Sequence, residues 1–251
     1  MTLQQQIRAN RRRSALVVSL FALLVVAVGA AAWYGLGQGI GVFVLAVGIA
    51  YGVFALLNAR GMVGSLTKAR PVTKADDPEL YRLVENVAIA AGLPATPSIR
   101  LVEDPAPNAF ATGLRPQSSF VAVTTGLREL MPPRELEAVI AHEIAHVRNR
   151  DTRLMTLAAV LVGVVALISD LAFRAAFFGG GRRSGGPAAI AAVIALVLAP
   201  IAAVLLQLAL SRRREFLADA SAAAILNDPE AMALALRRLE LDTREIAYGD
   251  R

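Results

Sequence analysis

The sequence predicts an α+β domain combined with four transmembrane helices that form two hairpins. The chain is 56% hydrophobic and only 18% charged, and soluble domains usually contain about a quarter of charged residues. Four apolar stretches are long enough to cross a bilayer, which takes ~20 helical residues. The polar segment 71–151 between them alternates helical and strand-like patterns, which indicates a mixed domain.

The first two apolar stretches predict an N-terminal transmembrane hairpin over residues 1–62. They cover 15–33 and 39–57, and the short loop between them has no charge. Arginines precede the first stretch and basic residues follow the second, so both ends are expected in the cytoplasm. A cleaved signal peptide would share the basic start. Its apolar core would be shorter, and a second span follows at once, so we expect an uncleaved hairpin.

Residues 63–153 predict the cytoplasmic α+β part. Asp77 and Pro78 are typical of a helix start, and an apolar stripe follows them. Alternating patterns predict strands over 98–103, 108–113 and 119–125. Pro132 and Pro133 then begin a long helix, which we expect to pack on a small sheet.

A second transmembrane hairpin is predicted over 154–210, with spans at 154–178 and 187–210. The loop 179–186 contains two arginines, but the flanks on the other side contain more, so the hairpin returns to the cytoplasm. Asp170 and Arg174 are expected to form an ion pair near the far headgroups. Residues 211–251 predict cytoplasmic helices, including one over 229–241, and a tail to which we assign no role.

The long helix carries an H-E-x-x-H motif, and its histidines are the two in the chain, His142 and His146. Helical residues four apart share a face, so both imidazoles can reach one tetrahedral zinc. Glu143 is rotated by about 100° from His142, where it can take a proton from metal-bound water. The neighbours are apolar, so the helix is buried, and two buried imidazoles are costly unless something pairs them. The motif therefore predicts a zinc hydrolase.

A catalytic zinc usually has three protein ligands and one open position. The chain has no cysteine and no further histidine, so the third ligand must be Asp or Glu. Glu215 and Asp219 lie four apart, next to the surface where the metal helix ends. One could bind the metal while the other accepts a hydrogen bond from a ligand histidine. On spacing alone, Glu215 could equally be a solvated charge beside three arginines.

Four segments resemble the HtpX-type membrane metallopeptidases, relatives of the eukaryotic CAAX prenyl protease. They are PNAFATG (107–113), VAVTTGL (121–127), LEAVIAHEIAHVRNRD (136–151) and SRRREFLAD (211–219). With the two hairpins, the resemblance extends to about residue 228. It implies a zincin-like catalytic domain with one Zn²⁺ per chain, held by His142, His146 and Glu215, and Glu143 as the general base.

Further residue roles come from the same resemblance. Asn108 and Ala109 match a strand whose edge is expected to bind the substrate backbone by strand addition. Asp151 and Asp219 match recurrent acidic positions and are expected to support the ligands or pack the helices. No third histidine is present as a transition-state donor. Arg212, Arg214 or a backbone N–H are therefore the candidates for stabilising the oxyanion.

We therefore expect a zinc endopeptidase in a bacterial cytoplasmic membrane, with both termini and the active site cytoplasmic. The resemblance implies that it cuts misfolded membrane proteins, so its partners are the lipid bilayer and protein substrates. The net charge of +6 does not predict nucleic-acid binding, because the basic clusters flank apolar runs. An intramembrane protease is disfavoured by the charges around the motif. A non-catalytic membrane scaffold with an inherited zinc site is the alternative.

Overall fold

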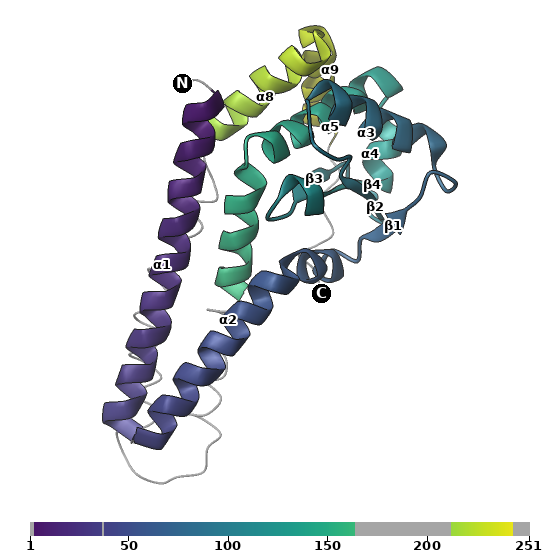
Figure 1. Ribbon diagram of the computed structural model, residues 1–251. Helices are drawn as coiled ribbons and strands as arrows, with labels where there is room; N and C mark the ends of the chain where they lie inside the picture. Colours follow the sequence, from purple (N-terminus) through teal and green to yellow (C-terminus); the bar gives the residue numbers. More distant parts are fainter. Residues whose placement is uncertain (1–2, 37, 164–211, 243–251) are drawn as a thin grey trace. The chain divides into compact units, whose positions relative to one another are not determined.

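The computed structural model describes residues 3–36, 38–163 and 212–242 (Figure 1). The chain divides into two compact units. Unit 1 comprises Met1–Asn10, Arg60–Thr156 and Ser211–Arg251, and unit 2 comprises Arg11–Ala59 and Leu157–Leu210. The span predicted at 187–210, most of the span at 154–178, the Asp170–Arg174 pair and the tail lie outside the described residues.

Unit 2 contains most of the two long helices α1 (Leu3–Leu36) and α2 (Gln38–Leu66). The helices approach closely where glycine removes a side chain. A Cβ on Gly48 would come within 2.8 Å of Val25, and one on Gly52 within 2.9 Å of Phe21. Both predicted N-terminal spans fall within these helices.

Apolar side chains also cover the outside of this helix pair. Leu23, Phe43 and Leu57 expose 65%, 67% and 80% of their surface. Within the described residues, Arg8–Ala30 is the one helical segment long and apolar enough to cross a membrane, and Leu45–Ala59 is a shorter apolar helix. By these criteria the remaining predicted spans are not confirmed.

Unit 1 is built around a four-stranded sheet in the order β1-β2-β4-β3. The strands are β1 (Arg70–Val72), β2 (Ser98–Val102), β3 (Ala109–Thr112) and β4 (Phe120–Thr124). β2 and β4 are parallel, and the other two pairs are antiparallel. The three predicted strands are confirmed, while β1 was missed because three residues are too few for an alternating pattern. β3 forms one edge of the sheet.

The helices of unit 1 gather around α5 (Pro133–Arg148), which packs against β3 and three helices. These are α3 (Pro78–Ala90), α8 (Arg212–Leu226) and α9 (Pro229–Leu241). A short 3₁₀ helix, η1 (Pro116–Ser118), and α4 (Thr125–Leu130) complete the unit, with a helix over 151–163 at its boundary. Leu136, Ile140 and Ile144 of α5 are fully buried. Each stabilises this packing by about 1.5–3 kcal/mol.

The chain turns sharply where α5 ends. Asn149 keeps helical geometry, but Arg150 adopts a left-handed conformation with φ of 63°. Such a conformation costs a non-glycine residue roughly 1–2 kcal/mol. The turn brings Asp151 back toward the last turn of α5, where His146 lies.

Candidate metal centre and active site

His142 and His146 lie one turn apart on α5 and direct the same ring atom toward each other. Their Nε2 atoms are 3.1 Å apart. The side chain of His146 is only 5% exposed, and that of His142 is 19% exposed. Two imidazole nitrogens with facing lone pairs repel one another unless a proton or a cation lies between them.

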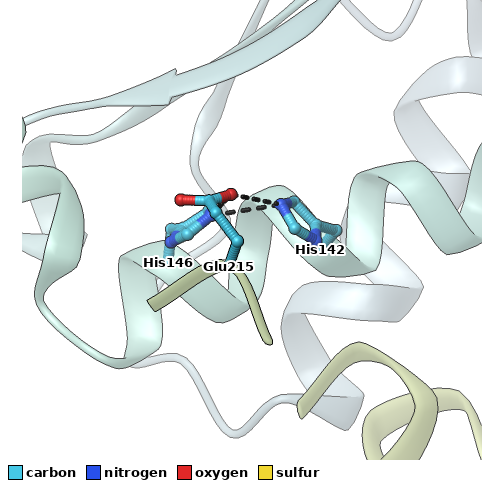
Figure 2. Close-up of side chains that lie close together, drawn as sticks. All are labelled: His142, His146 and Glu215. Carbon is cyan, nitrogen blue, oxygen red and sulfur yellow. Dashed lines mark hydrogen bonds and ion pairs between the residues drawn. The ribbon is translucent and has the colours of Figure 1, made fainter. Parts of the chain in front are cut away.

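Glu215 approaches both histidines from α8 (Figure 2). Its Oε2 lies 3.5 Å from Nε2 of His142 and 3.6 Å from Nε2 of His146. Metal–ligand bonds of about 2.0–2.2 Å in tetrahedral geometry place ligand atoms ~3.3 Å apart. The three observed separations lie around that value. Over residues 3–36, 38–163 and 212–242, this is the one group of His and acidic residues that could hold a metal ion.

A carboxylate lies against the second nitrogen of each histidine. Nδ1 of His142 is 2.8 Å from Oδ1 of Asp219, and Nδ1 of His146 is 3.2 Å from Oδ2 of Asp151. A carboxylate can only accept, so Nδ1 carries the hydrogen and the Nε2 lone pair remains available to a metal. Both acidic residues predicted near the ligands therefore contact a histidine.

Three ionisable groups of the centre, Glu215, His146 and Glu143, have perturbed pKa values. Hydrogen bonding to His146 lowers the pKa of Glu215 below its usual range, and burial opposes that shift. Burial alone would lower the pKa of His146, but hydrogen bonds with Asp151 and Glu215 outweigh it and raise the pKa to about 10. Burial raises the pKa of Glu143, against the nearby histidines and a backbone hydrogen bond from Ala111. A carboxylate with a raised pKa is a better proton acceptor.

A cavity of about 180 Å³ opens beside His142 and Glu143. Asn108 and Ala109, predicted to bind substrate, line it together with Pro107. The other walls are apolar and come from α4, α5 and α9: Leu127, Val139, Met232, Ala235, Leu236 and Leu239. The role of α9 was missed, because its apolar stripe at helical spacing is typical of a core helix.

The two predicted oxyanion arginines do not line this cavity. Arg212 is exposed, whereas Arg214 is 2% exposed and contributes to lowering the pKa of Glu215. A role in stabilising the oxyanion stays a prediction for both.

Comparison with known proteins matches this site to a family. The model of peptidase family M48 matches residues 74–245, which include the H-E-x-x-H motif and Glu215. The protease HtpX homolog of Lactobacillus helveticus (strain DPC 4571) is 41% identical over 264 residues, covering 99% of this chain and 88% of that protein. Those of Lactobacillus acidophilus and Listeria innocua are 43% and 42% identical, covering 95% and 96% of this chain and 84% and 85% of those proteins. The chain thus belongs to peptidase family M48, as an HtpX-type zinc metallopeptidase.

Proposed function

We propose that this metallopeptidase cleaves proteins at the cytoplasmic face of a bacterial membrane, with one zinc held by His142, His146 and Glu215. The observation that carries the proposal is the convergence of the two Nε2 atoms and the Glu215 carboxylate, with Glu143 on the same helix as both histidines. Three protein ligands leave a fourth position open for water, as a catalytic zinc site requires.

The chemistry follows from the residues around that position. When bound, zinc polarises the attacking water and the scissile carbonyl. Glu143 accepts a proton from the water while the water oxygen bonds to the carbonyl carbon. The same carboxyl then gives the proton to the amine nitrogen as the C–N bond breaks. Asp151 and Asp219 keep both imidazoles in the tautomer that binds metal.

Substrate binding is assigned to the edge of β3 and the adjoining cavity. An extended peptide adds to the edge of β3 at Ala109 through backbone hydrogen bonds. The backbone N–H and C=O of Asn108 already bond to Thr124, so we assign the side chain of Asn108, rather than its backbone, to substrate contact. A side chain next to the scissile bond then enters the cavity, whose walls from α5 and α9 are apolar. Extended segments with apolar side chains are accessible in unfolded proteins. This supports misfolded proteins, including membrane proteins, as the substrate class.

The membrane assignment rests on α1 and α2 and on the charges at their ends. Apolar side chains such as Phe43 and Leu57 remain exposed on this helix pair, and exposed apolar surface is typical of contact with lipid or protein. We assign transmembrane hairpins to residues 1–62 and 154–210, and cytoplasmic parts to 63–153 and 211–251. The arginine clusters at residues 8–13 and 212–214 support this orientation.

The test compares the full chain with its Glu143→Gln variant in detergent, with casein as an unfolded substrate. We expect both to bind about one zinc, and cleavage by the variant to fall by about 10²–10⁴-fold. Glu137→Gln is the matched control, since Glu137 lies on the same helix but about 120° around it. Equal cleavage by both proteins, or none by either at full zinc occupancy, would reject the mechanism. A non-catalytic scaffold with an inherited zinc site would then be the better description.

A further inference from the structure

A buried polar chain connects the N-terminal helix to one of the metal-binding histidines. Asn10 of α1 is fully buried, and its Nδ2 donates to Oδ1 of Asp151 at 2.5 Å and to the backbone oxygen of Asn149 at 3.0 Å. The other carboxylate oxygen of Asp151, Oδ2, lies 3.2 Å from Nδ1 of His146. Residues that are 139 and 141 positions apart in the chain thus meet within unit 1.

The Asn10 amide acts as the donor in this series of hydrogen bonds. Asparagine has two N–H donors, and the two acceptors here use both of them. Its Oδ1 has no hydrogen-bond partner in the part of the chain that the structure describes. Burying an amide costs free energy unless hydrogen bonds compensate, so these two bonds are what makes the buried position tolerable.

Asp151 needs this donor because it is itself completely buried. A buried carboxylate is stable only when its oxygens accept hydrogen bonds. His146 donates to Oδ2 and Asn10 donates to Oδ1, so each carboxylate oxygen has a donor that fixes its position. Without Asn10 the Oδ1 oxygen loses its donor, so the carboxylate is held less firmly and orients the imidazole less well.

We propose that Asn10 is a positioning residue of the metal centre. Acting through Asp151, it fixes the ring of His146 with Nε2 directed toward Glu215 and His142. The inference rests on the metal site proposed above. The first turns of α1 would then support the metal centre, in addition to placing basic residues next to the apolar span.

The experiment measures zinc affinity of the full chain in detergent by competition with a chromophoric chelator. Asn10→Ala removes the donor, and Asn10→Leu removes it while keeping the number and branching of the side-chain heavy atoms. Both variants are expected to bind zinc about tenfold more weakly, at the lower end of the 10–100-fold typical of outer hydrogen-bond partners. Asn58→Ala is the matched control, because the exposed Asn58 amide bonds to Phe54 one turn earlier in α2, and the substitution should leave the affinity unchanged.

A double-mutant comparison separates positioning from packing. If Asn10 acts through Asp151, adding Asn10→Ala to Asp151→Ala, which removes both carboxylate oxygens, should cause no further loss of zinc affinity. Additive losses, wild-type affinity in Asn10→Ala, or restored affinity in Asn10→Leu would each overturn the proposal. Should Asp151→Ala fail to fold, the two Asn10 variants decide by themselves. His146→Ala tests the underlying site separately, because unchanged zinc binding there would reject the metal centre itself.

Discussion

Asp219 of α8 lies 2.8 Å from Nδ1 of His142 on α5, one helical turn beyond Glu215 on α8. The helix that contributes a carboxylate to the metal centre therefore also orients one of the histidines. Any shift of α8 relative to α5 would disturb both interactions together, so their packing sets the geometry of the centre.

Asp219→Asn should weaken zinc binding by about 10–100-fold while leaving the fold intact, because the amide is a poorer acceptor for the Nδ1 hydrogen. Chelator competition measures the affinity, and thermal melting with excess zinc checks the fold. Glu230→Gln is a suitable control, since Glu230 bonds to Arg134 at the surface, away from the histidines. An unchanged affinity for Asp219→Asn would show that the 2.8 Å contact does not orient His142.

Glu215→Gln should lose stoichiometric zinc binding at neutral pH, because a neutral amide is a much weaker zinc ligand than a carboxylate. Metal analysis after gel filtration measures the bound zinc per chain. Casein cleavage should fall in parallel with the metal content. If the variant retained one zinc per chain, the third ligand would have to be a group other than the Glu215 carboxylate.

Leu236→Lys should lower kcat/KM for peptides with a large apolar residue at the scissile bond by about 10–200-fold, the range that a change of one methylene in an apolar pocket produces. Leu236 lines the cavity but is 44% exposed, so the fold should tolerate the change. Leu234→Lys is the matched control, since Leu234 is 40% exposed on the same helix and does not line the cavity. Equal effects of the two substitutions would argue against this cavity as the side-chain pocket.

The packing of α9 against α5 should depend on pH through Glu135. Its side chain is 8% exposed, and Nη2 of Arg238 donates to its Oε1 at 2.8 Å. This hydrogen bonding lowers the pKa of Glu135 below the ordinary 4.5. A carboxyl with a lower pKa in the folded state stabilises the fold above its unfolded pKa, and the stabilisation is lost as pH falls through the folded value.

Glu135→Gln should therefore lower the melting temperature at pH 7, and the difference from wild type should shrink at pH values below about 4. Glu85→Gln should have little effect at any pH, because its pair with Lys74 is exposed. A difference for Glu135→Gln that stayed constant down to acid pH would mean that packing, rather than charge, holds α9 at this point.

The elements with local signals in the sequence were the best predicted. The cap Asp77 and the prolines at helix starts mark α3, α5 and α9, and the predicted helix 229–241 has the observed bounds. Two short elements, β1 and α4, were not predicted. The pattern of β1 is too short to recognise, and α4 begins at Thr125, where the preceding strand was expected to end.

By itself the sequence determined that His142 and His146 share one helical face with Glu143 beside them, because a helix fixes that spacing over a single turn. Only the tertiary structure decided which carboxylate meets which histidine, that α9 closes a cavity beside Glu143, and that Asn10 reaches Asp151. These contacts join residues up to 141 positions apart. Such pairings depend on how whole helices pack, and the period of a local pattern contains no information about the partner that a face will meet.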